Sequence, residues 1–135
     1  MPDRLSPPPA TTADGELAIA KLSATSSDLR GCAILTADGS VLAASGDPAA
    51  WDGVASAMIE AADRAIDAPA TQIHVATEDG EVFAVRERDY AIVAAAERFA
   101  LASLFVCDLR ATLRELRRVA AGAPAEPAQR VGEAA

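Results

Sequence analysis

The sequence has few aromatic residues and few cysteines. Aromatic residues make up 4% of the 135 residues although 51% are hydrophobic, because alanine alone supplies roughly a quarter of the chain, far above its usual share. A core built from such small side chains must pack closely. The two cysteines, Cys32 and Cys107, are too few for a disulfide scaffold or for a cysteine-based metal site.

Basic side chains are also scarce, with 12 Lys plus Arg against 20 Asp plus Glu, a net charge of −8. This acidic balance argues against nucleic acid as a partner and against docking on anionic lipid. The longest apolar stretches, such as residues 91–96, are too short for membrane insertion, and the N-terminus shows no apolar segment typical of a signal peptide. We therefore expect a soluble, cytoplasmic protein.

The groups that usually carry catalysis are nearly absent. The chain has one histidine, His74, and no glycine-rich phosphate loop of the P-loop or dinucleotide type. His74 lies between Ile73 and Val75 in an expected strand, which favours an exposed or interfacial residue over a catalytic base. A metal site built from His74, Cys32 and Cys107 would need three distant segments to converge. We expect no enzymatic activity, no catalytic residues, no metal and no cofactor.

Proline-rich and unpatterned ends flank a single domain. Residues 1–13 include three consecutive prolines, and residues 121–135 are mostly Ala, Pro and Glu without periodicity. Neither end can bury enough apolar surface to offset its ordering entropy, so we expect disordered tails at both. The folded domain should span residues 14–120, since a second core would not fit in this length.

Hydrophobic periodicity and turn residues predict three helices and five strands. The turn signals are Asp38-Gly39 and Glu78-Asp79-Gly80, and Asp47-Pro48 opens the central helix. The expected helices span residues 16–23, 51–66 and 102–120, and the expected strands 31–36, 41–44, 71–77, 81–87 and 90–95. The first helix has an apolar side at helical spacing, formed by Leu17, Ala20 and Ala24. The apolar face of the central helix comprises Trp51, Val54, Ala55, Met58, Ala62, Ala65 and Ile66. Short hairpins force antiparallel pairing. We expect an α+β fold with one five-stranded antiparallel sheet flanked by helices, in the order α-β-β-α-β-β-β-α.

Two features in the middle of the chain favour self-association. Gly53, Ala57 and Ala61 recur every four residues beside the apolar face of the central helix, where small side chains leave a groove for another helix. The alternative explanation of this spacing is composition alone, because the chain is so rich in alanine. The strand at residues 71–77 follows a helix and could lie at the sheet edge, yet it contains neither the Lys nor the Pro that usually protects an edge.

The ordered set of elements resembles the roadblock domain family, which includes roadblock-type dynein light chains and the bacterial MglB-like proteins. The resemblance covers residues 16–119. It rests on Leu-Arg-Gly-Cys-Ala-Ile-Leu at 29–35, the turn at Asp38-Gly39 with the following strand, the long central helix, the three closing strands and the leucine-bearing last helix. Family members often carry Asn-Leu-Gly at the start of that last helix, where this chain has Ala100-Leu101-Ala102.

The resemblance implies a non-enzymatic homodimeric regulator or scaffold that binds a small Ras-like GTPase and modulates its activity. In such homodimers the central helices pack together and the third strands join two sheets into one. Carried over to this sequence, the dimer interface comprises Gly53, Ala57, Glu60, Ala61 and Arg64 of the helix and Gln72, Ile73, His74 and Val75 of the strand. The alternative is a small-ligand sensor domain of PAS/GAF-like or profilin-like type in bacterial signalling, because those folds share this architecture.

Overall fold

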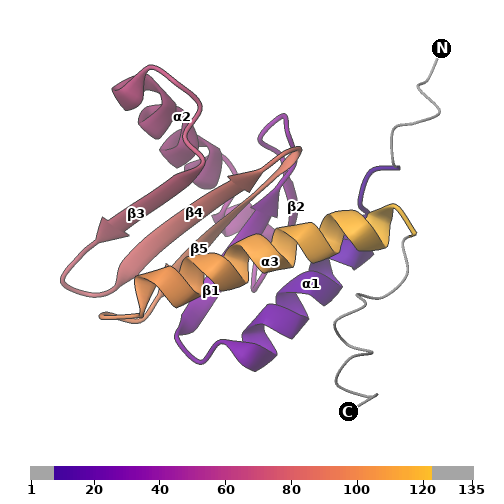
Figure 1. Ribbon diagram of the computed structural model, residues 1–135, viewed down its shortest axis with the longest axis horizontal. Coiled ribbons are helices and arrows are strands. Elements are labelled where there is room, and N and C mark those ends of the chain that lie inside the picture. The colour runs from indigo at the N-terminus through magenta and orange to yellow at the C-terminus, as the bar shows by residue number, and fades with distance from the viewer. Residues whose placement is uncertain (1–7, 123–135) are drawn as a thin grey trace.

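A computed structural model describes residues 8–122 and contains one antiparallel sheet of five strands with three α-helices. Helices α1 (Thr12–Thr25) and α3 (Ala102–Ala120) lie side by side across one face of the sheet, and α2 (Val54–Ile66) lies on the other (Figure 1). The strands are β1 (Leu29–Leu35), β2 (Val41–Ala44), β3 (Gln72–Ala76), β4 (Glu81–Glu87) and β5 (Tyr90–Ala96), in the spatial order β2-β1-β5-β4-β3. The predicted fold class and element order are confirmed.

Helix α1 begins four residues before its predicted start at Glu16. The Thr11 hydroxyl accepts a hydrogen bond from the Asp14 N–H, and the Asp14 carboxylate accepts one from the Thr11 N–H. This capping box satisfies two backbone donors that the first turn would otherwise leave unpaired. Residues 12 and 13, predicted to belong to the N-terminal tail, are therefore helical, whereas residues 1–7 and 123–135 of the predicted tails lie outside the described residues.

The buried side of α1 also differs from the prediction. We expected Leu17, Ala20 and Ala24 to mark its apolar side, but all three are exposed. The buried residues are Gly15, Ala18, Ile19 and Leu22. A Cβ at Gly15 would lie 2.8 Å from the Ala43 Cβ, so the missing side chain is what lets α1 approach β2 closely.

The segment predicted as one helix from Trp51 to Ile66 is divided in two. The Asp47 side chain accepts a hydrogen bond from the Ala49 N–H and caps a single 3-10 turn at Pro48–Ala50. Gly53 then takes φ = +78°, a conformation that favours glycine, and α2 starts only at Val54. The prediction that the helix starts at Trp51 is therefore wrong, because Gly53 interrupts the helical backbone.

Two apolar layers of unequal size hold the sheet. The larger lies under α1 and α3 and contains the fully buried side chains of Phe83, Ile92, Leu109 and Leu113. In the layer under α2, the buried members include Leu35, Ala84 and Val93 from the strands, and only Ala55 and Ile59 from the helix. Burial of one Ile and one Ala gains about 2–4 kcal/mol, so α2 is the most lightly attached helix of the described residues.

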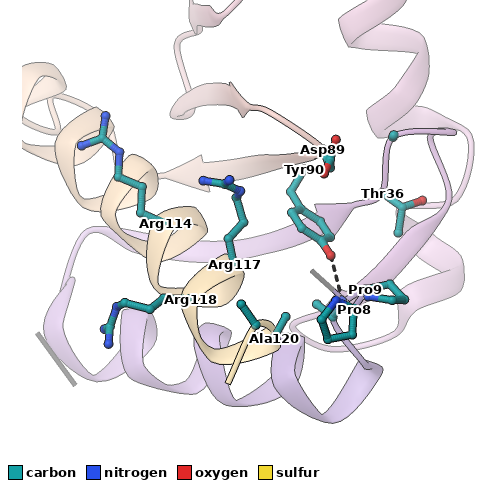
Figure 2. Close-up of a pocket in the computed structure, with 12 residues that line it drawn as sticks. Pro8, Pro9, Thr36, Asp89, Tyr90, Arg114, Arg117, Arg118 and Ala120 are labelled. Atoms are coloured by element: carbon teal, nitrogen blue, oxygen red, sulfur yellow. Dashed lines mark hydrogen bonds between the residues drawn. The ribbon is translucent and has the colours of Figure 1, made fainter. Parts of the chain in front are cut away.

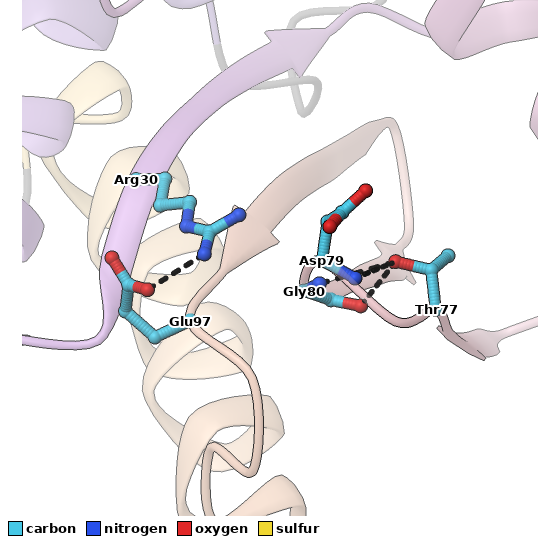
Figure 3. A network of polar contacts seen from close by, with 5 residues as sticks. All are labelled: Arg30, Thr77, Asp79, Gly80 and Glu97. Atoms are coloured by element: carbon cyan, nitrogen blue, oxygen red, sulfur yellow. Dashed lines mark hydrogen bonds and ion pairs between the residues drawn. The ribbon is translucent and has the colours of Figure 1, made fainter.

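Both predicted hairpin turns are present. Gly39 has φ = +87°, and the Asp38 carboxylate accepts hydrogen bonds from the Thr36 hydroxyl and from the Ser40 N–H, which lower the pKa of Asp38 to about 2. In the β3–β4 turn, the Thr77 hydroxyl accepts from the Gly80 N–H at 3.1 Å and donates to the Gly80 carbonyl at 2.7 Å (Figure 3).

The β3–β4 turn lies against the start of β1. A Cβ on Gly80 would lie 2.7 Å from the Arg30 Nη1 and 2.8 Å from the Ala96 carbonyl oxygen, so this turn has no room for a side chain. Arg30 in turn donates to the Glu97 carboxylate at 2.7 Å, and this hydrogen bond holds the pKa of Glu97 below its usual value (Figure 3). These contacts hold the turn between β3 and β4 against the start of β1.

Candidate functional site

Strand β3 forms one edge of the sheet, as the sequence predicted. It pairs only with β4, and at the two ends of this ladder the Arg86 N–H donates to the Thr71 carbonyl at 2.9 Å and the Thr77 N–H donates to the Gly80 carbonyl at 2.8 Å. Hydrogen-bonded pairs alternate along an antiparallel ladder. The backbone groups at positions 71, 73, 75 and 77 therefore point to β4, and those at 72, 74 and 76 point away from the sheet.

The side chains of β3 leave this edge open on both faces. Gln72, His74, Val75 and Ala76 are exposed, and only Ile73 is partly buried. Ile73 packs in the layer under α2, and Val75, on the same face of the sheet, is 46% exposed. A strand with free backbone donors and acceptors and an exposed apolar side chain is a template for pairing with another strand.

His74 is held in place by its neighbours on β4. Its Nε2 lies 2.6 Å from Glu81 Oε1, and its ring stacks on Phe83 with 4.3 Å between ring centroids. The Glu81 side chain is buried, and its Oε2 has no hydrogen-bond partner among residues 8–122. The pair therefore positions the imidazole on the sheet edge, beside a buried carboxylate oxygen that has no partner within the described residues.

The outer side of α2 carries the small residues that the sequence indicated. Ala57, Glu60, Ala61 and Arg64 are exposed on it, and Gly53 is exposed at its N-cap.

The apolar face predicted for α2 is only partly buried against the sheet. Of its predicted members, Ala55 is buried, Trp51, Met58 and Ala62 are partly buried, and Val54, Ala65 and Ile66 are exposed. Val54 and Ile66 are 65% and 61% exposed, so α2 presents apolar surface to solvent.

A polar contact fixes the C-terminal part of α2 relative to the β3 edge. Asp63 accepts hydrogen bonds from the Ala70 N–H at 2.7 Å and from Arg86 Nη2 at 2.9 Å. The backbone N–H of Ala70 and then the guanidinium of Arg86 hold the pKa of Asp63 below its usual value. This contact joins α2, the connection to β3 and the neighbouring strand β4, and the sequence pattern gave no signal for it.

The nine predicted interface residues thus lie on two neighbouring elements. Five belong to α2 or its N-cap and four to β3, and the two groups meet where Ile59 and Ile73 share the layer under α2. The sequence analysis did not place Val54 and Ile66 on the exposed surface beside these residues, because their spacing assigned them to the apolar face of the helix. It also did not place Glu81 beside His74, because that contact depends on the strand register.

The two cysteines and a possible metal site were the other chemical features of the sequence. Cys32 is buried, and burial raises the pKa of its thiol to about 11, whereas Cys107 is exposed on α3. Within residues 8–122, no group of three His, Cys, Asp or Glu side chains is arranged to hold a metal ion. The same residues include no helix with the length and apolarity needed to cross a bilayer.

Comparison with solved structures identifies the fold. A roadblock/LC7 domain from Streptomyces avermitilis superposes with a TM-score of 0.62 at 19% identity, covering 76% of this chain and 94% of that domain. The chain has the roadblock fold. MglB from Myxococcus xanthus gives a TM-score of 0.68 at 8% identity over 94% of this chain and 98% of that one. The gliding protein MglB from Thermus thermophilus gives 0.67 at 10% identity over 87% and 100%.

Comparison of sequences does not identify the roadblock fold. No family model matches the chain, and no curated protein matches it in sequence. The roadblock fold is nevertheless the architecture that the order of elements led us to expect, so the structural similarities confirm the resemblance at the level of the fold.

Proposed function

We propose that this chain is a non-enzymatic homodimeric regulator or scaffold that binds a small Ras-like GTPase and modulates its activity. The observation that carries the proposal is the open β3 edge beside the exposed small-residue side of α2. Both features are self-complementary, so a two-fold axis through the middle of β3 would bring two copies of each into contact. A solved MglB with a tetrameric arrangement shares this fold, with a TM-score of 0.61 at 17% identity.

The proposed dimer joins two five-stranded sheets through β3. Antiparallel pairing of two β3 strands over their full length, residues 72–76, would place His74 opposite His74 of the second copy. The outward backbone groups of Gln72, His74 and Ala76 would supply the new hydrogen bonds. The α2 helices would pack on one face of this joined sheet, where the small residues at 57 and 61 allow the two backbones to approach.

Proline substitutions test the strand pairing. We expect Ala76→Pro to weaken dimerisation at least about ten-fold while the subunit stays folded, because this N–H points away from the sheet and the substitution removes a donor only from the edge. Val75→Pro is the matched control, because its N–H points toward β4, and we expect it to lower subunit stability by about 3 kcal/mol. Analytical ultracentrifugation and thermal unfolding measure the two effects, and an Ala76→Pro variant that dimerises normally would exclude β3 from the interface.

The GTPase part of the proposal has its own test. The resemblance to MglB-like proteins suggests a small Ras-like GTPase, and the net charge of −8 would steer a basic patch of that partner toward this chain. We expect a Ras-like GTPase encoded beside this chain to be retained in a pull-down in one nucleotide state more strongly than in the other. Equal absence of binding with GDP and with a GTP analogue would contradict the GTPase proposal but leave the dimer proposal standing.

The proposal assigns the chemistry to the partner. The GTPase would supply the catalytic machinery for nucleotide hydrolysis, and this chain would supply a rigid two-fold platform without a cofactor. A cytoplasmic location also remains a prediction, consistent with a partner of this class.

A further inference from the structure

The last turn of α3 covers a cavity that the proposed interface does not use. A helix of 19 residues is about 28 Å long, whereas the seven residues of β5 span about 23 Å. The C-terminal end of α3 therefore extends past the start of β5, and the space beneath it has a volume of about 500 Å³. Its walls include Pro8, Pro9 and Ala120 on the apolar side and Tyr90 and Arg117 on the polar side (Figure 2).

Tyr90 provides a fixed polar group in this cavity. Its side chain comes from the first residue of β5, is 9% exposed, and accepts a hydrogen bond from the Ala10 N–H at 2.8 Å (Figure 2). A phenol donates as well as accepts. The hydrogen of the Tyr90 hydroxyl has no acceptor among residues 8–122, so it is available to a bound molecule.

Three arginines of α3 line the same cavity, and one of them has no counter-charge. Arg114 lies 3.2 Å from Glu87, and Arg118 pairs with Glu115. The Arg117 side chain makes no hydrogen bond or ion pair within residues 8–122, and in Figure 2 it extends toward the side on which Tyr90 lies, while Arg118 points away. Asp89 is the one acidic residue that lines the cavity, and no salt bridge joins it to Arg117 within residues 8–122.

We propose that this cavity binds a small organic anion, a phosphate monoester or carboxylate that carries an apolar group. The guanidinium of Arg117 would hold the anionic group, with Arg114 beside it, since arginine recognises carboxylate and phosphate through paired N–H donors. The Tyr90 hydroxyl would donate a further hydrogen bond. The apolar group would lie against Pro8, Pro9 and Ala120, and the volume is within the range of small-molecule sites.

The site lies away from the surface proposed for dimerisation. Its lining comes from the N-terminal segment, the β1–β2 and β4–β5 turns and the end of α3, and none of its members belongs to α2 or β3. Ligand binding can therefore be measured whether or not the chain dimerises, and either proposal can fail alone.

Titration with phenyl phosphate, followed by the backbone amide signals of Ala10, Ala37 and Tyr90, tests the proposal. We expect saturable shifts with phenyl phosphate and much weaker ones with inorganic phosphate or benzyl alcohol, which carry only the charge or only the apolar group. Arg117→Gln should raise the Kd about ten-fold or more, the factor for one lost hydrogen bond to a charged group. Arg98→Gln, which removes the same charge in the connection between β5 and α3, outside the cavity lining, should leave the Kd unchanged.

Three results would overturn the proposal. They are the absence of saturable shifts up to the solubility limit of phenyl phosphate, equal affinity for inorganic phosphate, and a Kd in Arg117→Gln equal to that of the natural chain. Tyr90→Phe keeps the ring and removes only the hydroxyl, so this single substitution should also raise the Kd for phenyl phosphate. Circular dichroism spectra of both variants establish that the fold is retained.

Discussion

The Ala57→Glu variant should sediment as a monomer at concentrations at which the natural chain forms the proposed dimer. Ala57 is exposed in the middle of the outer side of α2. A carboxylate at this position would enter a helix–helix contact without a partner, next to Glu60. An unpaired buried charge costs about 3–5 kcal/mol, so the dimer Kd should rise by two orders of magnitude or more.

A matched variant separates this effect from a loss of folding. Ala20 is exposed on α1, on the other face of the sheet, and Ala20→Glu makes the same chemical change on a helix surface that faces solvent. We expect this variant to keep the natural chain's mass by light scattering and its melting temperature. If Ala57→Glu also keeps the dimer mass, α2 is not part of the interface.

The sequence predicted the fold well because its signals are local. Two turns with glycine and the alternation of apolar residues predict the hairpins and one antiparallel sheet. The pairing of β1 with β5 joins strands that are far apart in the sequence, so no local signal predicted it. The edge position of β3 was predictable from a local signal, since a helix precedes the strand. The early start of α1 had a signal as well, because Thr11 and Asp14 have the spacing of a capping box.

The candidate site was only partly predictable because periodicity does not say what an apolar side chain faces. Val54 and Ile66 have the spacing of core residues, yet in a single subunit they are exposed. An apolar stripe on a helix fits a core and a subunit interface equally well. The contacts of Asp63 with Arg86 and of His74 with Glu81 join different elements, so they depend on a register that only the folded chain defines.

The Phe83→Ala variant should lose about 3–5 kcal/mol of stability, the usual cost of removing a buried aromatic ring. Phe83 is 0% exposed at the middle of β4, and its ring contacts the rings of Phe105 on α3 and of His74 on β3. It therefore links the main core to the sheet edge in a chain whose other core side chains are mostly aliphatic. Chemical denaturation followed by circular dichroism measures the loss.

Phe83→Leu is the control that separates filling the core from supporting the edge. Leucine keeps most of the buried volume, so this variant should lose no more than about 1.5 kcal/mol and stay folded. It removes the ring on which His74 stacks while the contact between His74 and Glu81 can persist. If stacking positions the β3 edge, Phe83→Leu should weaken the proposed dimer more than it weakens the subunit. A Phe83→Ala variant that loses less than about 1 kcal/mol would show that Phe83 does not hold this part of the core.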